Sequence, residues 1–367
     1  MSGLPEPVAD AWTSSTRSYS GRTGPLARFI LHVRTRSMFW SMRAITIDRF
    51  GGPDVLVLSE VPEPPPPGPG EVVVAIHAAG VNPLDAAVRS GRLAPLLGRD
   101  FPLIVGNDGA GTVTAIGAGV SNVGIGERVH GLFDAAPTPS RHGFATPGTY
   151  AELAVTRAST LARVPDDVDM VMAGAIPVAG LTAYQTLVRK ARIERRSSVL
   201  VIGASGGVGT FATQIAIALG AKVTGVAGGS RTELVRSLGA HTVIDHQEVD
   251  LTTLNDRFDL VYDVSTRFSF RCLRHLVAPG GLFVANIGPR LAMLSPNLRR
   301  PERRFGRYGF AWVTSDAHDL TALTAMVEAG QIRPCIEEVL PLADAATAHR
   351  ILESGRVFGK VVLDVRR

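Results

Sequence analysis

The stretch Val199-Leu-Val-Ile-Gly203-Ala-Ser-Gly206-Gly207-Val-Gly209 decides the predicted fold. Its apolar residues predict a short buried strand, its glycines a turn, and the alanine-rich segment 208–219 a helix. Glycine lets the backbone turn tightly and approach a pyrophosphate, whose negative charge the start of the following helix attracts. A glycine-rich loop alone is a weak signal, but this strand–loop–helix context predicts a dinucleotide-binding site.

The same alternation continues along the chain. Strand-like segments follow at 222–226, 241–245, 258–263 and 281–286, with a helical segment at 233–238. Alternating strands and helices predict a doubly wound parallel sheet of the Rossmann α/β type, which we place at residues 166–330.

The region before this sheet has a different pattern. Met42–Asp48 reads as an opening strand. An extended proline-rich connector, residues 62–69, lies between two strand-like segments, of which the second is Glu71–His77. Short strands and glycine turns then continue to about residue 165, which predicts a β-rich, barrel-like domain.

Residues 1–41 are rich in Ser, Thr, Arg and Gly and have no sustained period. We interpret them as an N-terminal extension that is disordered or begins at a mis-assigned start codon. A targeting peptide is the alternative, because the later part is rich in arginine and lacks acids. No apolar stretch reaches the roughly 20 residues of a membrane helix. The best candidate, Met170–Leu181, is too short and is interrupted by Pro177. We therefore expect a soluble protein.

Composition narrows the function classes. A chain of 367 residues predicts about two domains. The formal net charge is +5, of which residues 1–41 contribute +3, and we interpret the arginine cluster at 299–307 as a solvated loop. We therefore expect no nucleic-acid partner. The isolated Cys272 and Cys335 form no disulfide framework and indicate a reducing, cytoplasmic compartment.

The end of the second predicted strand indicates which cofactor binds. Proteins that bind NAD usually place Asp or Glu there to bind the ribose hydroxyls. This chain reads Val226-Ala-Gly-Gly-Ser230-Arg231, without an acid. A hydroxyl and a guanidinium attract a 2′-phosphate, so we favour NADPH over NADH. The alternative is that Arg231 only caps or solvates the next helix.

Several motifs together resemble one family from Met42 almost to the C-terminus. They are Met42-Arg-Ala-Ile with Phe50-Gly-Gly-Pro-Asp-Val-Leu, Gly80-Val-Asn82-Pro-Leu-Asp85, Gly126-Glu-Arg-Val-His-Gly, Gly148-Thr-Tyr150-Ala-Glu152, Ala179-Gly-Leu-Thr182-Ala-Tyr, the glycine loop, Ser237-Leu-Gly-Ala with Val243-Ile-Asp, and Gly359-Lys360-Val-Val-Leu. This set resembles the zinc-independent quinone oxidoreductases, zeta-crystallin among them, of the medium-chain dehydrogenase/reductase superfamily.

The resemblance implies a GroES-like catalytic domain, residues 42–165 completed by about 331–367, around the inserted Rossmann domain, and a homodimer. The active site is expected between the two domains. His246 stands where relatives usually have a tyrosine, and Lys360 is expected either to reach the phosphates or to form a surface salt bridge. The implied cofactor contacts are Thr182, Ala204, Ser205, Gly206, Gly207, Val208, Ser230, Arg231, His246, Asn286, Ile287, Gly288 and Lys360.

Zinc-dependent alcohol dehydrogenases are the alternative relatives. Their first zinc ligand is a cysteine where this chain has Asn82, and their His-Glu pair aligns with Asn107-Asp108. No cysteine lies between residues 42 and 271. Because tetrahedral zinc needs three or four thiolate, imidazole or carboxylate ligands, we expect no metal.

For catalysis we expect Asn82 and Asp85 to line the cleft. The Asn82 amide would donate to a carbonyl oxygen as charge develops, and Asp85 would organise a helix start or hold a water. Tyr150 is expected beneath the site. The predicted reaction is hydride transfer from NADPH to a quinone or an α,β-unsaturated carbonyl, although no tyrosine follows Gly91, where several alkenal-reducing relatives carry one. A zinc-type alcohol dehydrogenase relative, or a non-catalytic NADPH-binding regulatory or RNA-binding protein, remains as an alternative.

Overall fold

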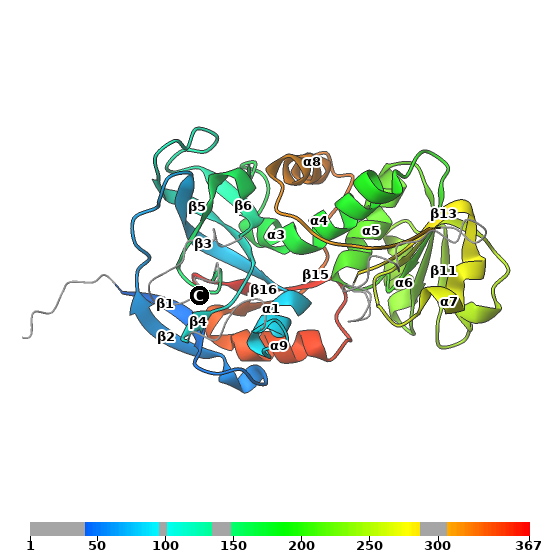
Figure 1. The fold of residues 1–367 in the computed structure, drawn as a ribbon, viewed down its shortest axis with the longest axis horizontal. Helices are drawn as coiled ribbons and strands as arrows, with labels where there is room; N and C mark the ends of the chain where they lie inside the picture. Colours follow the sequence, from blue (N-terminus) through cyan, green and yellow to red (C-terminus); the bar gives the residue numbers. More distant parts are fainter. Residues whose placement is uncertain (1–40, 95–100, 134–147, 287–306) are drawn as a thin grey trace, which may run out of the picture. The chain divides into compact units, whose positions relative to one another are not determined.

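The computed structural model describes residues 41–94, 101–133, 148–286 and 307–367 (Figure 1). The expectations for residues 1–40, for Ile287 and Gly288, and for most of the arginine cluster lie outside the described residues.

A six-stranded parallel sheet occupies the middle of the chain, so the predicted α/β class is confirmed. Its order is β11-β10-β9-β12-β13-β14. The chain runs outward from β9 to β11 and then returns beside β9 with β12. This reversal opens a crevice at the carboxyl ends of β9 and β12, where doubly wound sheets bind ligands. The strands are β9 (Ser198–Ile202), β10 (Lys222–Ala227), β11 (Thr242–Asp245), β12 (Phe258–Asp263), β13 (Val277–Ala285) and β14 (Arg307–Phe310).

Strand β9 is apolar from Val199 to Ile202 because helices cover both faces of this sheet. Val199 and Val201 pack in one hydrophobic core with α5, whereas Leu200 and Ile202 pack in another core with β12 and β13. This alternation is the two-residue period of a strand. The helical segments of this region are α5 (Gly207–Ala218), α6 (Arg231–Ser237), η4 (Leu251–Thr253), α7 (Phe270–Leu273), η5 (Arg274–Leu276) and α8 (Ala317–Glu328).

The β-rich region forms two further sheets. One has the order β15-β16-β3-β5-β6-β8, with β7 also paired to β3, and the other has the order β2-β1-β4. The proline run lies between β2 and β3, as predicted. The strands are β1 (Ser41–Ile47), β2 (Val57–Pro62), β3 (Glu71–Val81), β4 (Leu103–Ile104), β5 (Asp108–Ile116), β6 (Arg128–Leu132), β7 (Leu153–Arg157), β8 (Leu161–Arg163), β15 (Ile336–Pro341) and β16 (Lys360–Asp364).

Helical segments join and cover these strands. The apolar stretch Met170–Leu181 forms two helices, because Pro177 cannot continue the first helix and begins the second. No helix in the described ranges is long and apolar enough to cross a membrane. The segments are η1 (Pro53–Val55), α1 (Pro83–Arg89), η2 (Ala158–Thr160), α3 (Met170–Ala175), α4 (Pro177–Tyr184), the π-helix η3 (Gln185–Ala191), η7 (Leu342–Asp344) and α9 (Ala345–Glu353).

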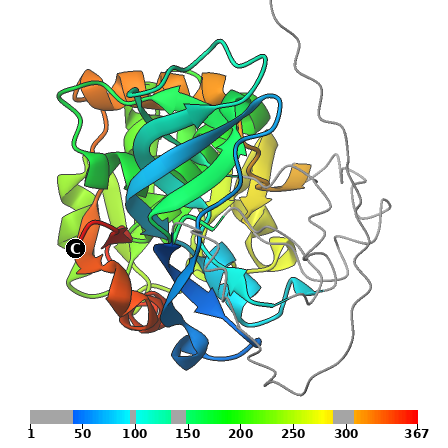
Figure 2. The same ribbon diagram turned by 90° about the vertical axis from the view of Figure 1, so that its left-hand side faces the viewer.

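The C-terminal segment returns to the N-terminal sheet. Strand β16 pairs antiparallel with β3, with Val361 opposite Val81, and β15 extends the sheet beyond β16. Figures 1 and 2 show these red and orange elements among the blue and cyan ones. Gly359, just before β16, donates its N–H to Ser205 O at 2.9 Å. The end of the chain is therefore fixed to both the β-rich sheet and the glycine loop.

We predict that Gly359→Ala lowers the free energy of unfolding by about 2–4 kcal/mol. Gly359 has φ +79°, and a Cβ there would collide with the Cys335 carbonyl. Gly280→Ala is the matched control, because Gly280 has φ +80° but open space around its Cα; it should cost only about 1 kcal/mol of conformational strain. Urea denaturation measures both, and equal losses would show that the packing of Gly359 is unimportant.

Candidate active site

A cavity of about 750 Å³ lies at the carboxyl ends of the parallel strands, which is within the usual size of a ligand pocket. One wall comes from the ends of β9, β10, β12 and β13, and the opposite side from β3, α1 and β16. Its lining residues are Val81, Asn82, Pro83, Val178, Ala179, Ile202, Gly203, Ser205–Val208, Val226–Gly228, Arg231, His246–Leu251, Val264, Ser265, Arg267, Phe268, Asn286, Leu352, Gly355, Val357, Gly359 and Lys360.

The glycine loop forms the middle of this cavity. Gly203 has φ +83°, and a Cβ on Gly209 would collide with the Gly203 carbonyl, so the start of α5 lies directly against the loop. Ser205, Gly206, Gly207 and Val208 line the cavity as the sequence predicts, whereas Ala204 is fully buried beneath it. The first N–H groups of α5, which have no partner within a helix, lie at this loop and suit a diphosphate.

The loop after β10 forms one end of the cavity. Arg231 and His246 both line it, and the Arg231 guanidinium donates to Gly355 O at 3.2 Å rather than capping α6. Ser230 is exposed at the start of α6, and its side chain makes no capping hydrogen bond.

Acidic side chains also lie near this end of the cavity, and two of them already accept hydrogen bonds from the protein. Asp245 accepts the Gly229 N–H at 2.9 Å and the Gln247 N–H at 2.8 Å, so its carboxylate is held by the backbone. Glu248 and Asp250 line the cavity, and Asp250 accepts both the N–H and the hydroxyl of Thr252.

At the other end, Asn286 lines the cavity and its Oδ1 accepts the Tyr262 hydroxyl at 2.7 Å. Thr182 is buried outside the lining, and its hydroxyl donates to Val178 O at 2.6 Å. Contact between Thr182 and a cofactor stays a prediction.

Three side chains from distant segments meet at the floor of the cavity, and we call them the floor triad: Asn82 and Lys360 line the cavity, and Asp108 is buried beneath them. The Asn82 amide nitrogen donates to Asp108 Oδ2 at 2.8 Å, and Lys360 Nζ donates to Asp108 Oδ2 at 3.3 Å and to Asn82 Oδ1. Asp108 Oδ1 also accepts the Val178 N–H of α4 at 2.7 Å. The carboxylate therefore joins β5, the start of α1, β16 and α4.

The floor triad has a buried charge balance. Asp108 is fully buried and Lys360 is 3% exposed. Burial raises the pKa of Asp108, while the charge of Lys360 and the hydrogen bonds from Asn82 and Val178 oppose that rise. Removing one ion of such a pair leaves the other desolvated and unpaired, which costs far more than the pair contributes.

The floor triad corrects two expectations. The Asn82 amide is not free, because its N–H groups donate to Asp108 and to Gly80 O, the latter at 3.2 Å. Lys360 is neither at the surface nor directed to the phosphate loop, because its ammonium donates to Val81 O at 3.1 Å, Asn82 and Asp108. The buried carboxylate attracts both donors inward.

Asp85 does not line the cavity, contrary to our expectation. It is fully buried and accepts the Asn82 N–H at 2.8 Å and the Tyr150 hydroxyl at 3.2 Å. It thus organises the start of α1, which is one of the two roles that the sequence predicts for it. Burial, and then the charge of Asp108, raises the pKa of Asp85 to about 7. Tyr150 lies beneath the site, as expected, and is fully buried.

Zinc does not fit the floor triad. An amide, a carboxylate and an ammonium surround the position, and a cation already interacts with the Asp108 oxygen. Neither Cys272 nor Cys335 lines the cavity.

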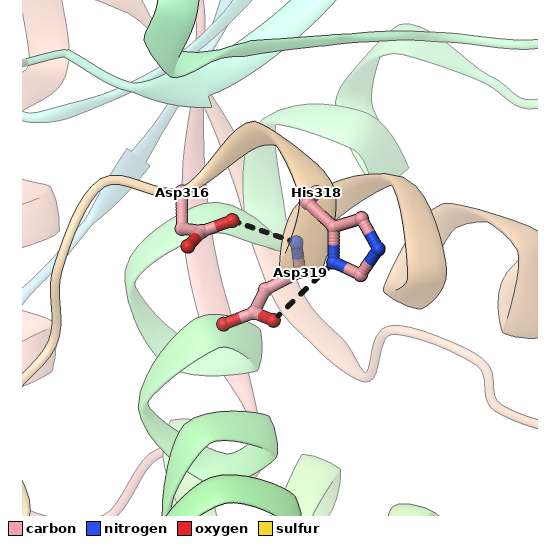
Figure 3. Close-up of side chains that lie close together, drawn as sticks. All are labelled: Asp316, His318 and Asp319. Carbon is pink, nitrogen blue, oxygen red and sulfur yellow. Dashed lines mark hydrogen bonds and ion pairs between the residues drawn. The ribbon is translucent and has the colours of Figure 1, made fainter.

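A second group of possible metal ligands, Asp316, His318 and Asp319, gathers at the start of α8 (Figure 3). Its two carboxylates already form salt bridges with Arg189, whose Nη2 lies 2.8 Å from Asp316 Oδ2 and 2.6 Å from Asp319 Oδ1. Asp316 also caps α8 by accepting the Asp319 N–H. We interpret the group as a helix start held by an arginine.

Sequence reasoning missed the partners that fix the floor. The sequence pattern identifies Asp108 only as standing in place of a zinc ligand, and it does not single out Arg89 or His349. Arg89 and Asp85 lie one helical turn apart on α1, which is the available sequence signal. The partners of Arg89 on α9, His349 and Glu353, and the partner of Asp85, Tyr150, are not visible in that local pattern.

Two family models match the chain. "Alcohol dehydrogenase GroES-like domain" matches residues 68–166, and "Zinc-binding dehydrogenase" matches residues 238–363. Among curated proteins, quinone oxidoreductase from Pongo abelii is 32% identical over 336 residues, covering 88% of this chain and 97% of the relative. The "NAD(P)H oxidoreductase RTN4IP1, mitochondrial" of Danio rerio is 31% identical, covering 88% of this chain and 91% of the relative.

Solved structures agree with these relatives. The quinone oxidoreductase from Coxiella burnetii superposes with a TM-score of 0.80 at 29% identity, covering 89% of this chain and all of that chain. A mycobacterial protein complexed with NADPH superposes with a TM-score of 0.71 at 28% identity, covering 88% of this chain and 99% of that chain.

We predict that Asp108→Asn lowers the free energy of unfolding by about 3–5 kcal/mol, because it leaves the buried Lys360 ammonium without a counter-charge. Lys360→Met should be similarly costly. The double variant should lose at least about 1 kcal/mol less than the sum of the single losses, because it removes both charges. Urea denaturation of the four proteins measures this coupling, and strictly additive losses would contradict it.

Proposed function

Because this chain belongs to the quinone oxidoreductases of the medium-chain dehydrogenase/reductase family, a nicotinamide-dependent oxidoreductase family, we propose that it is a zinc-independent reductase that transfers a hydride from NADPH to a quinone or an α,β-unsaturated carbonyl. The observation that carries the proposal is the single cavity that connects the glycine loop to the floor triad. A dinucleotide bound along the carboxyl ends of the strands would supply the hydride beside Asn82.

The residues at the β10 end support NADPH over NADH. Arg231 lines the cavity, Ser230 is exposed beside it, and no carboxylate lies between the end of β10 and Arg231. The Arg231 guanidinium and the Ser230 hydroxyl could both donate hydrogen bonds to a 2′-phosphate. The acid on the neighbouring strand, Asp245, holds the Gly229 N–H and is absent from the lining.

The floor supports an uncharged electrophile as the substrate. Apart from Lys360, the described lining near Asn82 is apolar, with Val81, Pro83, Val178 and Ala179. Lys360 brings a fixed positive charge whose field stabilises negative charge developing on a substrate oxygen, without transferring a proton. Its partner Asp108 limits that field, so the site suits acceptors that are already electron-poor.

Following NADPH oxidation with a panel of quinones and enones tests this proposal. We expect turnover with at least one class, and no dependence on added or bound zinc. Tight NADPH binding with no turnover on any acceptor would instead favour a non-catalytic NADPH-binding protein. Stoichiometric zinc in the purified protein would revive the alcohol dehydrogenase alternative.

We predict that Arg231→Ala weakens NADPH binding about 10- to 100-fold, the size of a lost charge-assisted hydrogen bond, and changes NADH binding less than about 2-fold. Arg236→Ala is the matched control: Arg236 lies on the same helix, pairs with Glu233 and is outside the lining. Titration of intrinsic fluorescence with each cofactor measures both. An equal loss for NADPH and NADH would contradict a role in 2′-phosphate recognition.

We also propose a homodimer, which the family resemblance supports, and a cytoplasmic location, which the two isolated cysteines support. Light scattering of the purified protein tests the homodimer, and cell fractionation tests the location; recovery in the mitochondrial fraction would instead match the mitochondrial relative from Danio rerio.

A further inference from the structure

A chain of buried polar side chains leads from the cavity floor to the contact between α1 and α9. We call it the buried relay: Asp85, Tyr150, His349 and Arg89. Asp85 Oδ2 lies 3.2 Å from the Tyr150 hydroxyl, which lies 3.2 Å from His349 Nε2. His349 Nδ1 lies 3.1 Å from Arg89 Nη1. The relay ends at the surface, where Arg89 pairs with Glu353 at 2.6 Å.

The chemistry of arginine fixes the direction of every hydrogen bond in the buried relay. A guanidinium only donates, so His349 Nδ1 accepts and Nε2 carries the proton. Nε2–H then donates to the Tyr150 oxygen, and the Tyr150 hydroxyl donates to Asp85. Burial, and then the charge of Arg89, lowers the pKa of His349 to about 3, which keeps it neutral in this tautomer. The relay is therefore a one-way series of donors that ends on Asp85.

The last acceptor in the series holds the cavity floor. Asp85 Oδ2 also accepts the backbone N–H of Asn82 at 2.8 Å, and Asn82 and Pro83 both line the cavity. Asp85, Tyr150 and His349 are all fully buried, and Arg89 is 2% exposed. Apolar side chains could pack α1 against α9 without the cost of desolvating these groups. Packing alone therefore does not explain these polar groups. Because their hydrogen bonds end on the Asn82 backbone, we look for their role in the site.

We propose that Tyr150 and His349 are positioning residues of the reductase reaction, which act through Asp85 to fix Asn82 and the start of α1 in the cavity floor. This inference rests on the proposed function, because it assigns the role to catalysis. It differs from the function of the floor triad, which orients the Asn82 side chain, because the buried relay holds the Asn82 backbone.

The groups around Asp85 give the proposal a measurable signature. Its second oxygen, Oδ1, is buried without a hydrogen-bond partner, so its ionisation depends on the donors at Oδ2 and on nearby charges. Burial, and then the charge of Asp108 on β5, raises the pKa of Asp85, whereas the Asn82 N–H, the charge of Lys360 on β16 and the Tyr150 hydroxyl lower it. His349 on α9 connects to Asp85 through Tyr150, Arg89 on the same helix as Asp85 connects through His349, and Glu353 on α9 contacts Arg89. Loss of the Tyr150 hydroxyl must therefore raise the pKa of Asp85.

Tyr150→Phe and His349→Gln test the proposal, because both nearly preserve side-chain volume. The matched control is His130→Gln. His130 is also a fully buried neutral histidine, bonded to Ala173 O and Thr324 Oγ1 at 3.0 and 2.8 Å, but it has no connection to Asn82. We expect Tyr150→Phe and His349→Gln to lower kcat about 3- to 10-fold, the size of one lost buried hydrogen bond, while the Kd of NADPH changes less than about 2-fold. His130→Gln should lower stability but leave kcat unchanged.

The pH dependence separates positioning from mere packing. A carboxyl group ionises as the pH increases through its pKa, and loss of the Tyr150 hydroxyl raises the pKa of Asp85. The part of the pH–rate profile that follows the ionisation of Asp85 should therefore move to higher pH in Tyr150→Phe. Asp85→Asn should abolish this part of the pH dependence. A 13C NMR titration of the Asp85 carboxyl, assigned with Asp85→Asn, follows the same event without any substrate. In the same samples, the amide proton of Asn82 should shift in Tyr150→Phe and His349→Gln but not in His130→Gln.

Two sets of results would overturn the inference. In an active wild-type protein, an unchanged kcat and pH profile in both variants would show that the buried relay does not position the site. An unchanged Asp85 titration and Asn82 amide shift would overturn it even if the wild type reduces none of the acceptors. If the wild-type protein reduces none of the acceptors, the proposed function fails. The NMR measurements still test the inference in that case, so the two failures are distinguished.

Discussion

The buried carboxylate of Asp108 is the contact on which the rest of the cavity depends. A fully buried charge must be matched by a counter-charge and by hydrogen bonds, and Asp108 takes these from Lys360, Asn82 and Val178. Each partner belongs to a different segment. The requirement therefore fixes the register of β16 beside β3, places the first turn of α4 over the floor, and turns the Asn82 amide inward.

The glycine loop and the floor triad are also connected to each other. Gly359 binds Ser205 through its N–H, and its neighbour Lys360 packs its aliphatic stem near Gly207. One short segment thus touches the predicted diphosphate site with its backbone and the floor with its charge. Closely approaching backbones are possible there because Gly359 and Gly207 lack side chains.

Local patterns were sufficient to predict the fold and the cofactor loop. The β9–loop–α5–β10 series is contiguous, and each step has its own signal: an apolar strand buried on both faces, glycines at the turn, and a helix of alanines and branched residues. The resemblance added the GroES-like fold, which the sheet pairing of β16 with β3 agrees with. The individual cofactor contacts stay predictions.

The same reasoning failed where the partners are far apart in sequence. Asn82 and Asp85 are three residues apart and look like equal candidates for the cleft, yet one lines the cavity and the other is fully buried. What separates them is Asp108, Tyr150 and Lys360, which lie 26, 65 and 278 residues from their partners. A local pattern carries no information about such contacts, so the orientation of a polar side chain can be read only from the folded structure.

The nature of the floor limits which reactions the site can promote. A zinc ion activates a carbonyl by accepting its oxygen as a ligand in an open coordination position. The Lys360 ammonium offers no such position, because its donors already serve Val81 O, Asn82 and Asp108. It contributes a fixed field instead, and the paired carboxylate weakens that field. An unactivated ketone needs strong polarisation before it accepts a hydride, whereas a quinone or an enone spreads the incoming charge over its own conjugated system. The ion pair in the floor therefore favours the proposed acceptors over the alcohol and ketone substrates of zinc enzymes.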